Sequence, residues 1–218
     1  MITLLINIFK TFTRTERLVL YGAFLIILVA GAMLSIIIFR SATVEVPAPS
    51  PLYTEGVLGQ PTLINPVIAG GNDADRDLIK LLFSDVISMA ENYKSSDDFR
   101  TWNIVLKDNL RWSDGKLLTT DDILFTLDAL QNSESRSPLS LNWQGVVANR
   151  ISEREIEFTL RIPYIFFLDN LKELLIIPKH IWGAIPVTNF HLSQFNLEPV
   201  GNRPYKYSSF EKRPDGFI

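Results

Sequence analysis

The chain has 218 residues, of which 47% are hydrophobic and 21% charged, with no cysteine and a formal net charge of −3. These values are typical of globular proteins and exclude long disorder, collagen and a disulfide scaffold. The absence of cysteine also excludes thiol catalysis, cysteine-ligated zinc and anchoring through a lipid-modified cysteine.

An apolar segment dominates the start of the chain. Residues 18–39 contain no charged side chain, and a helix of that length, about 33 Å, is long enough to cross a bilayer. Lys10, Arg14 and Arg17 precede it, so the positive-inside rule places residues 1–17 in the cytoplasm. A cleaved signal peptide is the competing interpretation, but its apolar core is usually only about 7–15 residues long. We expect an uncleaved signal anchor that crosses the cell membrane once and leaves the C-terminal part extracytoplasmic.

Residues 40–52 are interpreted as a linker, because prolines separated by small residues favour an extended spacer. Residues 53–218 are then enough for one domain. Four of the basic residues and one acidic residue precede position 41, so residues 41–218 carry a net charge of −6. No cluster of basic and aromatic residues accompanies this acidic balance, which excludes nucleic acid as a partner.

Hydrophobic periodicity after the linker predicts a mixture of strands and helices. Thr119 and Asp122 have the spacing of a helix-capping pair. The predicted elements are a short strand over 57–63, a helix over 74–90, a strand over 100–107, a turn at 113–115, a helix from 120, a strand over 155–162, a helical stretch over 164–175 and a helical turn over 178–182. This order indicates an α/β or mixed α+β domain.

Signals for catalysis are weak. The two histidines, His180 and His191, are outside any metal-binding motif, and His180 is interpreted as a helix-start residue bonded to backbone or solvent. The acidic pairs at 97–98 and 121–122 are adjacent in sequence and are better explained as a solvated turn and helix-terminal charges. We expect no metal, no cofactor and no enzyme activity. The tryptophans are interpreted as core residues rather than a ligand groove: Trp102, Trp112, Trp143 and Trp182.

Residues 111–130, RWSDGKLLTTDDILFTLDAL, resemble the signature of the family 5 extracellular solute-binding proteins, the peptide-, dipeptide- and nickel-binding receptors of ABC importers. In that family a basic-aromatic-x-Asp-Gly turn is followed by Thr-x-x-Asp at the start of a helix. The matching positions are Arg111, Trp112, Asp114, Gly115, Thr119, Asp122 and Ile123. Further segments between 53 and 218 follow the family's order. The resemblance implies an α/β (mixed α+β) lobe like that of type II periplasmic binding proteins.

Two departures from the family are visible. Family members are typically more than twice as long and enclose ligand between two lobes, so we interpret the chain as a truncated, N-terminal part with one incomplete lobe. In addition, Asn202 and Arg203 stand where the family commonly has Thr and Gly. If that glycine has a positive φ, Arg203 is expected to strain the turn.

The resemblance implies a membrane-anchored extracytoplasmic protein that captures oligopeptides, dipeptides or another small solute and delivers them to the permease subunits of an ABC transporter. In peptide-binding relatives an extended ligand pairs with main chain near the first strand, and this role carries over to Glu55, Gly56 and Val57. The alternative is a membrane-anchored docking or sensory module that no longer encloses solute. A hydrolase that uses acids such as Asp121 is a third hypothesis, supported by composition alone.

Overall fold

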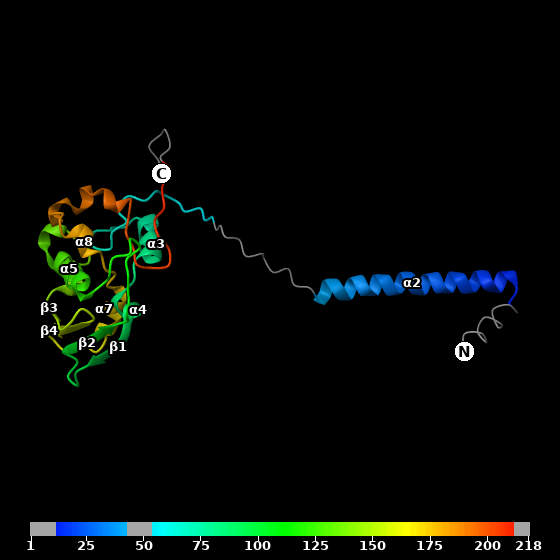
Figure 1. Ribbon diagram of the computed structural model, residues 1–218, viewed down its shortest axis with the longest axis horizontal. Helices are drawn as coiled ribbons and strands as arrows, with labels where there is room; N and C mark the ends of the chain where they lie inside the picture. Colours follow the sequence, from blue (N-terminus) through cyan, green and yellow to red (C-terminus); the bar gives the residue numbers. More distant parts are fainter. Residues whose placement is uncertain (1–11, 43–53, 212–218) are drawn as a thin grey trace. The chain divides into compact units, whose positions relative to one another are not determined.

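The computed structural model describes residues 12–42 and 54–211 (Figure 1). The chain divides into two compact units, Met1–Glu55 and Gly56–Ile218, which are described separately. Residues 1–11 of the expected cytoplasmic segment and most of the expected linker lie outside the described residues.

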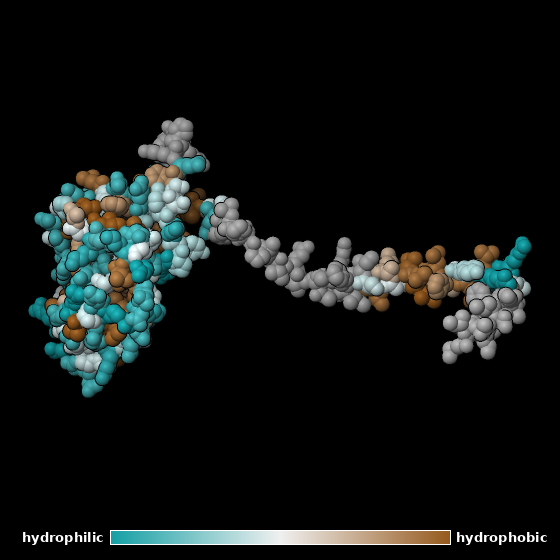
Figure 2. Space-filling view, in the orientation of Figure 1, coloured by the Kyte–Doolittle hydropathy of each residue, from teal (hydrophilic) through white to brown (hydrophobic). Residues whose placement is uncertain are grey.

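The described part of the first unit is dominated by helix α2, Arg14–Ala42. Its stretch Arg14–Ser35 is long and apolar enough to cross a membrane, with a mean hydropathy of 2.4 and no burial against the rest of the protein. Figure 2 shows apolar residues along this helix and polar ones at its N-terminal end. A core helix of a soluble protein that passes this test of length and hydropathy is mostly buried, whereas a signal sequence near the N-terminus also passes it.

The second unit is built on a four-stranded antiparallel sheet with the strand order β1-β2-β4-β3. The strands are β1 (Ala90–Ser95), β2 (Thr101–Leu106), β3 (Val146–Arg150) and β4 (Glu155–Leu160). The central strands β2 and β4 alternate half-buried and buried residues, as predicted. The edge strands β1 and β3 were missed, because their residues are mostly exposed and show no such alternation.

Helices cover one side of this sheet. Helix α5 begins at a capping box in which Thr119 and Asp122 each accept a backbone N–H of the other, as predicted. The helices are α3 (Asp73–Leu82), α4 (Val86–Met89), α5 (Thr120–Gln131), α6 (Ser140–Trp143), α7 (Phe167–Glu173) and α8 (Lys179–Trp182), with 3₁₀ turns η1 (Ser133–Ser135), η2 (Val187–Leu192) and η3 (Gln194–Asn196). The mixed α/β class is therefore confirmed.

Two predicted elements near the start of this unit are wrong. The strand over 57–63 is irregular backbone, because the N–H groups of Thr62 and Leu63 donate to the carboxylate of Asp75 instead of to a neighbouring strand. The single helix over 74–90 is broken between α3 and α4. There the N–H of Ser84 donates to Asn202 Oδ1 at 2.7 Å, and Asp85 caps α4. Tertiary hydrogen bonds replace the helical ones at this point.

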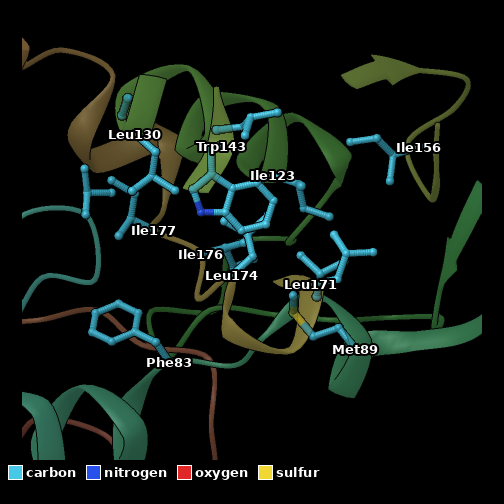
Figure 3. Close-up of a cluster of buried hydrophobic side chains, with 14 of the residues drawn as sticks. Phe83, Met89, Ile123, Leu130, Trp143, Ile156, Leu171, Leu174, Ile176 and Ile177 are labelled. Carbon is cyan, nitrogen blue, oxygen red and sulfur yellow. The ribbon is translucent and has the colours of Figure 1, made fainter. Parts of the chain in front are cut away.

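The core lies between the sheet and the helices. Phe167 of α7 is 1% exposed, and its ring is 5.8–6.2 Å from the rings of Phe158, Trp102 and Trp143. Figure 3 shows further members of this core: Leu130 of α5, Leu171 of α7, and Leu174, Ile176 and Ile177 from the segment that follows α7. All four tryptophans are 2–5% exposed, so their interpretation as core residues is confirmed.

The turn at Asn202 and Arg203 is not strained in the way expected. Arg203 has no positive φ, and its N–H and that of Asn202 both donate to the carbonyl of Leu82, at 3.1 and 2.9 Å. The position that requires glycine is Gly201, directly before Asn202, because a Cβ there would be 2.2 Å from the carbonyl oxygen of Leu82. Gly201 therefore permits the close approach of this segment to the end of α3.

Candidate functional site

Two buried residues of the 111–130 signature, Trp112 and Asp122, belong to a polar network. Asp122, 4% exposed, accepts hydrogen bonds from the N–H of Thr119 at 3.0 Å, the indole of Trp112 at 3.3 Å and the N–H of Lys179 at 2.9 Å. Burial raises the pKa of Asp122, and these three donors partly offset that effect. The carboxylate of Asp122 thus connects Trp112, the start of α5 and the start of α8. All three of its donors belong to the protein's own fold.

A second contact of the signature involves His180. Its Nε2 lies 2.6 Å from Oδ2 of Asp114, which corrects the expectation of a partner in backbone or solvent. Burial works to raise the pKa of Asp114, but hydrogen bonds from His180 and the N–H of Lys116 hold it below its usual value. Gly115, with φ +88°, closes the turn that carries Asp114. The pair ties this turn to α8.

The acidic residues offer no catalytic arrangement. Asp121 lies 3.6 Å from the guanidinium of Arg150, and the carboxylate of Asp98 accepts hydrogen bonds within its own turn. Within residues 12–42 and 54–211, no group of three or more His, Asp or Glu side chains is placed to hold a metal ion. Asp121 and Asp98, one from each acidic pair, are therefore engaged in an ion pair and a turn.

The predicted ligand-binding residues lie at the start of the second described segment. Glu55, Gly56 and Val57 are exposed, and their backbone groups form no hydrogen bond with any described residue. Just beyond them the chain is fixed, because Asp75, 1% exposed, accepts three hydrogen bonds from Thr62 and Leu63. Free main-chain groups beside a fixed segment are what strand pairing with a peptide requires, and the assignment stays a prediction.

A hollow that the sequence did not reveal lies between the loop 66–71, α3, the end of α5 and residues 173–175. Its volume is about 360 Å³, within the range of small-molecule sites. We call it the 66–71 pocket. Its floor is apolar: Ile79, Leu130 and Leu174 are 5, 2 and 1% exposed.

Two glycines form one wall of the 66–71 pocket. The loop before them is held by Asn65, whose carbonyl accepts the N–H groups of Ile68 and Ala69. The next residues, Gly70 and Gly71, are exposed, and no atom lies within 4 Å of where a Cβ would be. Their N–H groups have no acceptor among the described residues. They are therefore main-chain donors available to a ligand.

The rim of the pocket carries charges of both signs. Arg76 pairs with Asp73 in the first turn of α3. Lys80 and Glu173 also line the pocket, and neither forms an ion pair with a described residue. An apolar floor, main-chain donors and charges of both signs suit a ligand with a charged end beside an apolar group. The consecutive glycines ahead of the capped helix α3 are the sequence signal from which this pocket could have been found.

Comparison with known proteins gives a consistent result. Residues 86–214 match the family described as bacterial extracellular solute-binding proteins, family 5 Middle. The oligopeptide-binding protein AppA of Bacillus subtilis is 26% identical over 170 residues, which cover 72% of this chain and 31% of AppA. The sequence resemblance to family 5 is thereby confirmed.

Solved structures of this kind are similar in fold. The ABC transporter substrate-binding protein CtaP from Listeria monocytogenes is 30% identical with a TM-score of 0.65, over 71% of this chain and 33% of CtaP. NikZ from Campylobacter jejuni in complex with Ni(L-His) is 28% identical with a TM-score of 0.61, over 71% and 32%. AppA in complex with a nonapeptide is 26% identical with a TM-score of 0.65, over 72% and 33%. The chain spans about a third of the length of these relatives.

Proposed function

This chain belongs to the bacterial extracellular solute-binding proteins of family 5, and we propose that it forms part of a membrane-anchored extracytoplasmic receptor that captures peptides for an ABC transporter. AppA, which is similar to it, is an oligopeptide-binding protein. The observation that carries the proposal is the 66–71 pocket, because its lining matches the chemistry of a peptide end. The protein binds its solute and leaves it chemically unchanged.

The pocket offers a charged partner to either end of a peptide. The ammonium of Lys80 suits a C-terminal carboxylate, and the carboxylate of Glu173 suits an N-terminal ammonium. The N–H groups of Gly70 and Gly71 donate to main-chain carbonyls. The floor of Ile79, Leu130 and Leu174 takes an apolar side chain. Recognition through main-chain groups tolerates many side chains, as peptide capture requires.

The segment Glu55–Val57 extends this proposal to the body of the peptide. Its backbone groups are free of described partners, so an extended ligand pairs with them as an added strand. Helix α2 serves as the membrane anchor, with the second unit outside the cytoplasm, because residues 18–39 carry no charge and the stretch Arg14–Ser35 has a mean hydropathy of 2.4.

Isothermal calorimetry of the full chain in nanodiscs against a mixed nonapeptide pool tests the pocket. We expect Lys80→Ala to weaken binding by roughly tenfold through loss of one charged contact. Lys94→Ala is the matched control, because Lys94 is an exposed lysine on edge strand β1, outside the pocket. Equal affinities for the two variants would remove the pocket from the proposal.

A second pair of variants tests the predicted strand pairing. Val57→Pro removes the backbone N–H at that position, whereas Val57→Ala keeps it and shortens the side chain. We expect peptide binding to weaken in the first variant alone. A full chain that binds no peptide at all would instead support the docking or sensory module.

A further inference from the structure

The loop between β4 and α7 exposes an uninterrupted run of apolar residues. Ile162, Tyr164, Ile165 and Phe166 are 73, 43, 55 and 60% exposed, and Pro163 between them is exposed as well. No other five consecutive residues in the described range 54–211 are all apolar and exposed. We call residues 162–166 the apolar loop. Apolar residues scattered singly on a surface are ordinary, but a contiguous group marks a contact surface.

The exposure of the apolar loop is built into the fold. The N–H of Tyr164 donates to the carbonyl of Phe99 at 3.2 Å, and the carbonyl of Tyr164 accepts the N–H of Phe167 at 3.2 Å. Phe167 is buried in the core at the far end of the loop. The rings of Tyr164 and Phe166 lie against each other, with centroids 6.0 Å apart. The loop is therefore held in place with its apolar side chains turned outward.

Polar side chains accompany the apolar loop. A hollow of about 480 Å³ adjoins it, and Ile162 and Tyr164 belong to the lining of this hollow. Four polar side chains also line it: Asn142, Gln144, Arg161 and Asn170. No described residue forms a hydrogen bond with these four side chains, and Arg161 is in no ion pair within the described part of the chain. Aromatic and aliphatic side chains beside an arginine and amide groups match the layered chemistry of a lipid–water interface.

The chain segment between α2 and the second unit limits how far the second unit can move from a membrane that holds α2. Helix α2 ends at Ala42 and the second unit begins at Gly56. Fourteen residue steps separate these positions, so the span is at most about 50 Å. A tethered surface meets its partner at high effective concentration, so a weak contact suffices.

We infer that the apolar loop docks into the lipid–water interface of the membrane that holds α2, with Ile165 and Phe166 inserted and Arg161 at headgroup level. This inference rests on the proposed membrane anchor. A zwitterionic surface is the fitting partner, because residues 41–218 carry a net charge of −6 and are repelled by anionic lipid. Docking orients the second unit at the membrane surface.

The absence of cysteine allows a direct test. The full chain with Ile165→Cys, labelled with an environment-sensitive fluorophore, is reconstituted in phosphatidylcholine vesicles with and without doxyl-labelled lipid. We expect roughly twofold quenching of this label by doxyl lipid, as for a side chain in the interface. Leu192→Cys on η2 is the matched control, because Leu192 is apolar and 79% exposed, and its label stays unquenched. Adding both Ile162→Ser and Phe166→Ser to the Ile165→Cys chain abolishes the quenching. Adding Ile162→Ser with Phe166→Leu instead keeps it, because leucine at position 166 remains apolar.

The outcomes separate the two proposals. Failure of the chain to float with the vesicles would overturn the anchor itself. Flotation with equal quenching at the two labelled positions, or with none, would overturn the docking of the apolar loop and leave the anchor intact. Shielding of the Ile165→Cys label that grows with the number of chains per vesicle would show that a second copy of the chain covers the loop, and would overturn the inference of a lipid partner.

Discussion

The 111–130 signature and the 66–71 pocket belong to the same unit but use their polar groups in opposite ways. In the signature, Asp122 is buried and bonded to three donors within the protein. In the pocket, the N–H groups of Gly70 and Gly71 and the ammonium of Lys80 bond to no other residue in the described part of the chain, and all three residues line an open hollow. The segment that identifies the family is therefore scaffold, and an inconspicuous loop carries the chemistry available to a ligand.

The largest expected effect tests the scaffold side of this contrast. Trp112 is 2% exposed and packs beside His180, so Trp112→Ala should lower the free energy of unfolding by about 3–5 kcal/mol through loss of buried contacts. Leu117→Ala changes an apolar side chain in the same signature that is 55% exposed, and should stay within about 0.5 kcal/mol of the parent. Urea denaturation measures both. Similar values for the two variants would mean that the signature is not a packed unit.

A smaller loss is expected from the buried carboxylate. Asp122→Asn replaces one acceptor oxygen by a donor that faces backbone N–H groups, which should destabilise the fold by about 1–3 kcal/mol. Its neighbour Asp121 is only in an exposed pair with Arg150, so Asp121→Asn should shift stability by less than about 1 kcal/mol. Chemical denaturation of the two variants measures both effects. A larger loss of stability for Asp121→Asn than for Asp122→Asn would contradict the role of Asp122 in connecting α5 and α8.

The pH dependence of stability probes the turn that carries Asp114. The folded-state pKa of Asp114 is lowered, so its contribution is present above its unfolded pKa, about 4, and is lost as pH falls through the lower folded value. The contribution of Asp122 to stability changes with pH in the opposite direction. Because the folded-state pKa of Asp122 is raised, its contribution is lost as pH rises through that pKa. Asp114→Asn should therefore flatten the acid limb of a stability curve measured by denaturant unfolding. An unchanged acid limb would show that the contact with His180 contributes nothing.

The smallest expected change in stability concerns the 66–71 pocket. Gly71 has no left-handed φ and open space at its Cβ position. Gly71→Ala should therefore leave the fold intact or stabilise it by about 0.4–1 kcal/mol, because alanine restricts the unfolded chain. Calorimetry with the nonapeptide pool should show weaker binding, since the added methyl group enters the pocket. Destabilisation of the variant would mean that the loop is packed scaffold like the signature.

The predictable parts of the fold were those with strong local signals. The alternation of β2 and β4 and the capping box of α5 are written in consecutive residues, so both were found from sequence. The break between α3 and α4 was not predictable, because it depends on Asn202, which is 118 residues from Ser84. The edge strands β1 and β3 were not predictable either, because pairing with β2 and β4 defines them and their own sequences show no alternation.

The sequence by itself determined the family, the mixed α/β class, the apolar helix and the core role of the tryptophans, because each is encoded in composition, periodicity or a run of adjacent residues. Only the tertiary structure decided which polar groups are consumed inside the fold and which stay open. Residues 66–80, which include loop 66–71 and most of α3, are distant along the chain from residues 130–139 and 173–175, and these segments form a pocket only when packed together. A side chain's availability to a ligand depends on such neighbours, which no local pattern records.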